Sequence, residues 1–228
     1  MKRSIFFALS IMILVMVLAC GTSGPTAFGL LRDAASKIAE AETIAFSIDR
    51  VGESYGWDLG GETADITSTT GEYEAPDKVQ LIIDLDIGGE SLTMDLVMID
   101  EDSYLKMPPL FDEYEPFDME EELSASMLFA KDGGVPTILK STLKSTSLAE
   151  EEETVDGITC YHITATGDAD NIAGVIGFGG AEAGDGTVDV WIAKDTGALY
   201  RITVKDQKGN GWTMTLSAYN QGVDIPAL

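Results

Sequence analysis

Histidine and cysteine are scarce in this chain of 228 residues, which contains one histidine and two cysteines. A zinc site takes three or four protein ligands, drawn mainly from these two residue types, so the single His162 argues against such a site. The acidic runs around Asp100 and Glu151 lack the glycine-spaced loop with which proteins bind calcium and are typical of solvated turns. We predict that the protein holds no metal ion and no other cofactor.

An activated nucleophile is equally hard to find. Ser103–Lys106 and Ser141–Lys144 both match the Ser-x-x-Lys motif of penicillin-binding proteins and β-lactamases. The Ser-Asp-Asn and Lys-Thr-Gly motifs that complete such a site are missing, and so short a pattern often occurs by chance. A hydrolase acting on lipids is therefore a weak alternative, and we predict that the protein is not an enzyme.

Basic residues are outnumbered by acidic ones, 14 Lys and Arg against 39 Asp and Glu, which gives a net charge of −25. Proteins that bind nucleic acid need Lys and Arg to neutralise the phosphates, so nucleic acid is excluded as a partner. The same charge repels an anionic membrane surface. Attachment to a membrane therefore requires an anchor rather than a basic patch.

One long hydrophobic run is present, and it lies at the N-terminus. Met1-Lys2-Arg3 precede the apolar stretch Ile5–Ala19, whose 15 residues fall short of the roughly 20 that span a bilayer. This pattern is typical of a secretory signal peptide over residues 1–19. We therefore expect the protein outside the cytoplasm.

A cysteine follows this run directly. Val17-Leu18-Ala19-Cys20 resembles the lipobox of bacterial lipoproteins, in which the cysteine thiol takes a diacylglycerol and becomes the new N-terminus. We predict lipidation at Cys20, a tether over residues 20–28, and one domain over residues 29–228 held at the cell membrane. A chance cysteine beside an ordinary cleavage site and an uncleaved anchor are the alternatives.

The second cysteine, Cys160, could pair with Cys20 in an oxidising compartment. A lipidated Cys20 would have no thiol left for such a bond. Residues 158–163 alternate as a strand does, and the pattern favours a small buried thiol at Cys160.

The periodicity of the remaining chain predicts an α+β fold made mainly of antiparallel strands. Residues 27–42 have the apolar spacing of a helix, and the period changes to two from Thr43 onward. The polar residues 52–73 predict one or two exposed strands. From typical strand lengths we expect roughly nine to eleven strands in total.

The segment 78–99 predicts a hairpin in a defined register. A two-residue turn at Gly88-Gly89 pairs residues whose numbers sum to 177, so that one face of the hairpin is wholly apolar. The expected pairs are Val79–Met98, Leu81–Leu96, Ile83–Met94 and Leu85–Leu92.

Two further hairpins are expected near the C-terminus. A three-residue turn at 195–197 predicts the pairs Val188–Val204, Val190–Ile202 and Ile192–Tyr200. We expect the next strand to pair Val204 with Met214 and Ile202 with Leu216. That register requires an odd-length loop around residues 208–211 and excludes a two-residue turn at Asn210-Gly211.

Three segments do not follow the strand pattern. Residues 119–129 and 135–148 have helical spacing, and we expect them to cover the apolar face of the sheet. Residues 170–184 are apolar and rich in glycine, which predicts a flexible lip over 171–180 rather than a packed element.

The order of these elements resembles the LppX/LprG family of bacterial lipoproteins, which are relatives of the LolA and LolB carriers. The resemblance runs from about Leu30 to Pro226 and rests on the segments LLRDA, IAFSIDRVG, DSYLKM, EETVDGITCYHITATGD, VDVWIAKDTGALYRITV and MTLSAYNQGVDIP. It implies a strongly curved antiparallel half-barrel with helices on its concave apolar side. It also implies a lipid-anchored protein that carries acylated lipids or glycolipids between membranes, without catalytic residues.

A carrier of this kind has to replace the bilayer around an acyl chain. Moving about 15 methylenes from a bilayer into water costs on the order of 12 kcal/mol, so an apolar cavity is needed. The candidate cavity residues are Leu81, Ile83, Leu85, Leu92, Met94, Leu96, Met98, Met127, Ile138, Leu139, Val175, Ile176 and Phe178. The few basic candidates at its mouth are Lys78, Lys106, Lys131, Lys140 and Lys144.

The same apolar pattern also fits an ordinary core, because alternation does not separate a cavity from packed side chains. An envelope scaffold or sensor whose sheet is filled by its own side chains, acting through a protein partner in the envelope, is therefore the alternative function.

Overall fold

The computed structural model describes residues 24–58, 63–100, 102–117, 128–176 and 180–228. In this part of the chain thirteen strands form one antiparallel sheet, more than the nine to eleven predicted. The strands are β1 (Thr43–Val51), β2 (Gly56–Asp58), β3 (Thr63–Glu74), β4 (Lys78–Ile87), β5 (Glu90–Ile99), β6 (Asp102–Met107), β7 (Phe111–Pro116), β8 (Lys144–Leu148), β9 (Glu153–Val155), β10 (Ile158–Asp168), β11 (Asp185–Ala193), β12 (Leu199–Lys205) and β13 (Gly211–Ser217). Their order is β7-β6-β5-β4-β3-β1-β13-β12-β11-β10-β8, with β2 paired to β3 and β9 to β10.

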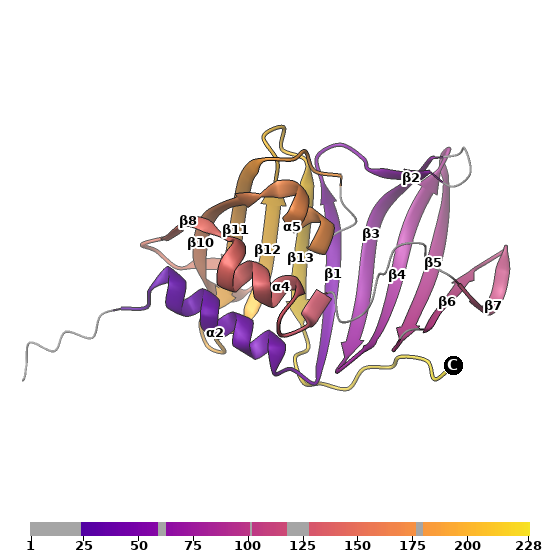
Figure 1. Ribbon diagram of the computed structural model, residues 1–228, viewed down its shortest axis with the longest axis horizontal. Helices are drawn as coiled ribbons and strands as arrows, with labels where there is room; N and C mark the ends of the chain where they lie inside the picture. Colours follow the sequence, from indigo (N-terminus) through magenta and orange to yellow (C-terminus); the bar gives the residue numbers. More distant parts are fainter. Residues whose placement is uncertain (1–23, 59–62, 101, 118–127, 177–179) are drawn as a thin grey trace, which may run out of the picture.

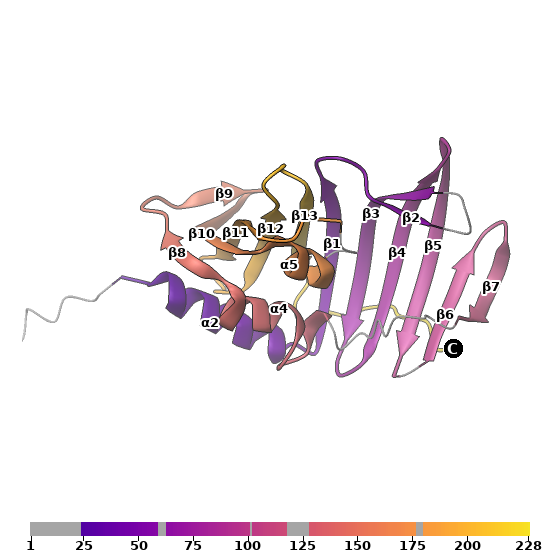
Figure 2. The same ribbon diagram turned by 45° about the horizontal axis from the view of Figure 1, so that its top comes forward.

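The helices gather on one side of this sheet (Figures 1 and 2). They are α2 (Ala27–Ala39), α4 (Gly134–Thr137), the π-helical turn η1 (Ile138–Thr142) and α5 (Ala169–Ile176). α2 begins after Thr26, whose hydroxyl oxygen accepts a hydrogen bond of 3.1 Å from the backbone N–H of Gly29 and so caps the helix. The helix ends at Ala39, a little before the predicted end, and buries the stripe Leu31, Ala34, Ala35 and Ile38.

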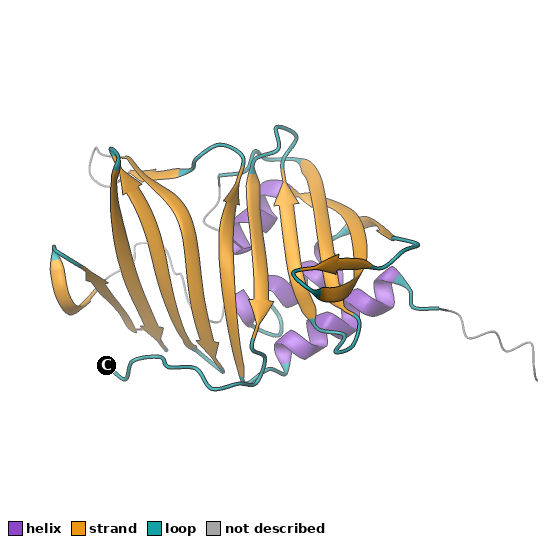
Figure 3. Cartoon of the chain, turned by 180° about the vertical axis from the view of Figure 1, so that it is seen from behind, coloured by secondary structure: helices purple, strands orange, loops and turns teal. Residues whose placement is uncertain are grey.

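The sheet curves around these helices, which lie in front of β10–β13 (Figure 1). We call the concave, helix-covered side the inner face and the opposite side, seen in Figure 3, the outer face. Alternate side chains of the strands point to the inner face and join those of the helices in one hydrophobic core. The predicted half-barrel α+β fold is therefore confirmed.

The register predicted for residues 78–99 is confirmed. β4 and β5 pair Val79 with Met98, Leu81 with Leu96, Ile83 with Met94, and Leu85 with Leu92. Both glycines of the connecting turn have positive φ angles, 62° and 92°, as a two-residue hairpin turn with this twist requires. Of the one or two exposed strands predicted between residues 52 and 73, two are present, as β2 and β3. β3 is not exposed, because alternate residues such as Ala64, Ile66 and Thr69 are buried on the inner face.

The C-terminal hairpins follow the prediction only in part. β11 and β12 pair Val188 with Val204 and Val190 with Ile202, but an irregularity after Trp191 pairs Ile192 with Leu199 instead of Tyr200. The predicted β12–β13 register is wrong by two residues, because Val204 pairs with Trp212 and Ile202 with Met214. The loop between Lys205 and Gly211 has an odd length of five residues, so the same side chains still face inward.

Two of the predicted non-strand segments need correction. Helical structure in 135–148 ends at Thr142, and Lys144–Leu148 is strand β8, which pairs with β10. The expected flexible lip is largely α5, whose Ile172 and Ala173 are fully buried. Of the predicted helix 119–129, residues 119–127 lie outside the described residues, and Phe129 is buried in the core.

Candidate functional site

The candidate cavity residues on β4 and β5 lie together on the inner face. Five of them are at most 3% exposed: Leu81, Ile83, Leu85, Leu96 and Met98. Leu92 and Met94 are half-buried and pack against the same core. The hairpin register thus brings all seven side chains into one continuous apolar surface.

The helical candidates belong to the same core but lie over another part of the sheet, β10–β13 (Figure 1). Ile138 and Leu139 of η1 are buried in the same hydrophobic core, and Val175 of α5 is half-buried against it. Met127, Phe178 and the side chain of Ile176 lie outside the described residues. The structure therefore places ten of the candidates in one core and leaves these three as predictions.

Three aromatic side chains join the segment before α4 to the sheet, and none of them was among the candidates. Phe129 meets Phe46 at a centroid distance of 5.2 Å and Tyr73 at 5.0 Å. The ring of Phe46 lies directly over Gly71, where a Cβ atom would stand 2.3 Å from its Cζ atom. The alternation of β1 and β3 could have placed Phe46 and Tyr73 on the inner face.

One polar side chain is buried on the inner face without a hydrogen bond. Thr69 of β3 is 0% exposed and lies between its cross-strand neighbours Ile48 and Ile83. Its Oγ1 atom has no hydrogen-bond partner among the described residues. An unpaired buried hydroxyl carries a desolvation penalty, so Thr69 is a polar exception on an otherwise apolar surface.

Arg50 is the inner-face cation that the sequence analysis missed. It follows Ile44, Phe46 and Ile48 at the period of two that points these side chains inward, so the signal was present in the sequence. Its guanidinium carbon lies 5.0 Å from the ring centroid of Trp212 and 5.7 Å from that of Tyr55. None of the five lysines predicted at the cavity mouth has a described contact with this arginine.

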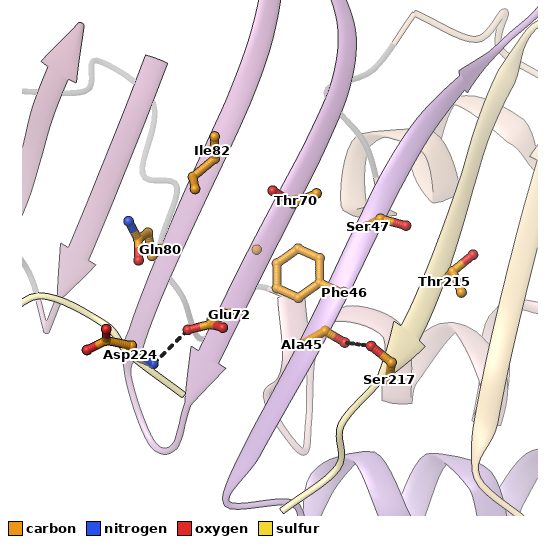
Figure 4. A pocket seen from close by; sticks show the side chains of 11 residues that line it. Ala45, Phe46, Ser47, Thr70, Glu72, Gln80, Ile82, Thr215, Ser217 and Asp224 are labelled. Carbon is orange, nitrogen blue, oxygen red and sulfur yellow. Dashed lines mark hydrogen bonds between the residues drawn. The ribbon is translucent and has the colours of Figure 1, made fainter. Parts of the chain in front are cut away.

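A pocket of about 470 Å³ lies on the outer face, away from the helices (Figure 4). Its lining is mixed polar and apolar and comes from β1, β3, β4, β13 and the C-terminal segment: Ala45, Phe46, Ser47, Thr70, Gly71, Glu72, Gln80, Ile82, Thr215, Ser217 and Asp224. The backbone N–H of Asp224 donates to the Glu72 carboxylate at 2.8 Å and closes one side. This pocket does not coincide with the predicted apolar cavity.

One serine motif bears on the prediction that the protein is not an enzyme. Gly52-Glu53-Ser54-Tyr55-Gly56 matches Gly-x-Ser-x-Gly, the pattern of a nucleophile elbow, in which the serine stands on a turn between a strand and a helix. Here the motif connects β1 to strand β2. His162 is not available as its base, because both ring nitrogens face carboxylates, Nδ1 at 3.3 Å from Glu153 and Nε2 at 2.9 Å from Asp189.

Cys160 is a buried free thiol, as predicted. Burial raises its pKa, with a smaller contribution from Glu153, so the reactive thiolate is disfavoured. Within the described residues no group of three or more potential ligands could hold a metal ion. In the same part of the chain no helix has the length and apolar character to span a membrane.

The comparisons with known proteins agree with this architecture. The sequence matches the LppX_LprAFG lipoprotein family over residues 27–225. LprF from Mycobacterium bovis superimposes with a TM-score of 0.69 at 17% identity, covering 91% of this chain and 99% of that one. The Mycobacterium tuberculosis lipoprotein LppX gives a TM-score of 0.59 at 22% identity, covering 90% and 100%. No curated protein sequence gives a significant match. With nearly the whole domain matched, the chain belongs to the LppX_LprAFG lipoprotein family.

Proposed function

We propose that this protein is a membrane-anchored extracytoplasmic lipoprotein that binds the acyl chains of a lipid or glycolipid and carries them across the cell envelope. The observation that carries the proposal is the continuous apolar inner face of a half-barrel in a family of lipoproteins. Binding takes place along the inner face of the sheet, from β4 and β5 toward the helices that lie over β10–β13. Cys20 holds the domain at the membrane.

The inner face is suited to hydrocarbon because it offers apolar side chains and little else. Removing one acyl chain of about 15 methylenes from a bilayer costs on the order of 12 kcal/mol. Contacts with Leu81, Ile83 and their neighbours offset that cost by replacing the lipid environment. The half-buried Met94 is flexible and polarizable, so it can adapt to chains of different shape.

Apart from the 13-residue α2, the helices over the inner face are short. α4 has four residues, η1 five and α5 eight, and short elements with few internal hydrogen bonds open at low free-energy cost. π-Helical turns such as η1 are frequent at functional sites. A bound chain is accommodated when Ile138, Leu139 and Val175 move away from the sheet.

An envelope scaffold with a filled core is the second candidate function. It is favoured by the packing of the described inner-face side chains, which contact one another in one core. In that case the protein acts through a surface contact with an envelope partner. The outer-face pocket, lined in part by Ile82, is then the more relevant feature.

The test uses residues 21–228, which include every described element, purified and examined by native mass spectrometry before and after incubation with phosphatidylcholine vesicles. The carrier proposal predicts a lipid-bound mass, and an unliganded mass in both samples supports the scaffold. Met94→Trp adds volume at a half-buried inner position and is expected to lower lipid uptake. Ile82→Trp is the matched control. Ile82 is next in sequence to Ile83, the cross-strand partner of Met94, but it lies on the outer face and is 38% exposed. Loss of uptake in Ile82→Trp alone would assign binding to the outer pocket instead.

A further inference from the structure

We infer that Arg50 is the binding point for an oxyanion, a phosphate or carboxylate, at the rim of the inner face. This inference rests on the proposed function, because the lipid headgroup is the foremost source of such an anion. A free phosphate has the same chemistry. The experiment below separates the two.

Arg50 lies at the edge of the apolar inner face, next to three backbone carbonyl groups. It is the last inward-pointing residue of β1 after Ile44, Phe46 and Ile48, and its cross-strand partner is Trp212 on β13. Tyr55 lies on its other side. An amphiphile whose chain lies along the inner face therefore brings its polar end to a guanidinium held between two aromatic rings.

Within the described residues, the hydrogen bonds of Arg50 all go to backbone carbonyl groups and none goes to a carboxylate. Nε donates to the carbonyl of Glu53 at 2.7 Å, Nη2 to that of Gly180 at 2.9 Å, and Nη1 to that of Gly211 at 3.3 Å. All three acceptors are neutral. Because a guanidinium has five N–H groups, these bonds orient the fork and leave two N–H groups for a ligand.

Six of the other eleven basic side chains in the described part of the chain lie 3.4 Å or less from a carboxylate oxygen: Arg32, Lys78, Lys144, Lys194, Arg201 and Lys208. Arg50 forms no ion pair within the described residues, although the chain carries 39 acidic residues. Partial burial of a charged group costs free energy when no opposite charge lies nearby. A bound oxyanion would supply that opposite charge.

Asp206, the carboxylate with the largest effect on the pKa of Arg50, already accepts hydrogen bonds from other groups. Asp206 raises the pKa of Arg50, but the larger effect is burial, which lowers it. The Asp206 carboxylate accepts hydrogen bonds from the backbone N–H groups of Glu182, Lys208 and Asn210 at 2.8 to 3.0 Å. It is therefore held by its own loop rather than by the guanidinium.

The experiment compares Arg50→Gln with Arg201→Gln. Arg201 is the matched control, because it loses the same charge from the outer face, where it pairs with Asp156 at 2.6 Å. Residues 21–228 of each variant are incubated with dioleoyl-phosphatidylcholine vesicles that contain equal minor amounts of dioleoyl-phosphatidylglycerol and of dioleoylglycerol, which has the same acyl chains and no oxyanion. Native mass spectrometry then gives the ratio of bound phosphatidylglycerol to bound dioleoylglycerol, and thermal unfolding verifies that each variant is folded.

We expect the wild-type protein and Arg201→Gln to prefer phosphatidylglycerol over dioleoylglycerol by about tenfold, the scale of one or two charge-assisted hydrogen bonds, and Arg50→Gln to bind both lipids equally. Equal binding of both lipids by the wild-type protein, without stabilisation by inorganic phosphate, would overturn the role of Arg50 and leave the carrier function intact. If the wild-type protein takes up neither lipid, the proposed carrier function is itself contradicted.

Two further measurements use inorganic phosphate and the variant Arg50→Lys. Stabilisation by inorganic phosphate in the wild-type protein but not in Arg50→Gln, without a lipid preference, assigns the site to a free anion. If Arg50→Gln does not fold, Arg50→Lys replaces it. Lysine keeps the charge but loses the planar fork, so the preference is expected to fall without vanishing, and an unchanged preference contradicts the inference.

Discussion

The unpaired hydroxyl of Thr69 gives a quantitative test of the inner-face packing. Thr69→Val exchanges the hydroxyl for a methyl group of nearly the same size. The fully buried Oγ1 has no hydrogen-bond partner among the described residues, and a buried unsatisfied polar group costs about 1–3 kcal/mol. We therefore expect Thr69→Val to raise the free energy of unfolding by about that amount.

The assay is thermal unfolding of residues 21–228 freed of lipid, followed by circular dichroism. For a domain of this size, 1 kcal/mol corresponds to about 2–4 °C in Tm, so the expected rise is roughly 2–12 °C. Thr203→Val is the control, because Thr203 is 7% exposed and its hydroxyl bonds that of Thr213 at 2.9 Å. It is expected to lose about 0.5–1.5 kcal/mol. Equal destabilisation of both variants would refute the assignment of Thr69 as an unpaired polar group on an apolar surface.

Three other substitutions test the anchor, the aromatic contact and an acid-sensitive loop. Cys20→Ser should release the protein from the membrane fraction, and continued retention in the lipid fraction would reject the lipid anchor. Gly71→Ala places a Cβ atom 2.3 Å from Cζ of Phe46 and should lower the free energy of unfolding in urea by about 1–3 kcal/mol; no loss would mean that Phe46 can turn away. Backbone hydrogen bonds lower the pKa of Asp206, so its contribution to stability is complete above about pH 4 and is lost as the pH falls through its lowered pKa. Asp206→Asn should flatten the acid side of the stability curve, and a curve identical to that of the wild-type protein would contradict this.

The register of β4 and β5 could be predicted because every second residue of both strands is apolar, although Ile82 and Val97 also place apolar side chains on the other face, and because the Gly88-Gly89 turn allows one loop length. The β12–β13 register could not. A shift of two residues keeps Met214 and Leu216 on the same face, so hydrophobic alternation cannot distinguish a loop of five residues from a longer odd one. The sequence therefore predicts that the β12–β13 loop has an odd number of residues, but it does not predict how many.

Short elements were the other source of error. α5 covers Ala169–Ile176 and includes Gly174, so its two turns give too little periodicity to separate a helix from a loop. Its burial of Ile172 depends on packing against β10–β13, which local sequence does not encode. Residues 144–148, KSTSL, have no apolar stripe, and pairing with β10 makes them a strand.

The candidate site shows the same division between local and tertiary information. Inward-facing positions on β4 and β5 followed from alternation alone, and the same rule places Arg50 inward after Ile48. What the sequence does not contain is the choice of partner. Trp212 and Gly180 reach Arg50 from positions more than a hundred residues along the chain, so its orientation depends on the finished fold.

Photocrosslinking with a phosphatidylcholine that carries a diazirine at the end of one acyl chain identifies the residues that contact a bound chain. The lipid is loaded from vesicles onto residues 21–228, irradiated, and the modified residues are located by tandem mass spectrometry. If the acyl chain binds on the inner face, the label attaches at inward positions of β4 and β5, such as Leu81, Ile83 and Met94. Labelling at the alternate positions Gln80 and Ile82, which line the outer pocket, would contradict binding on the inner face.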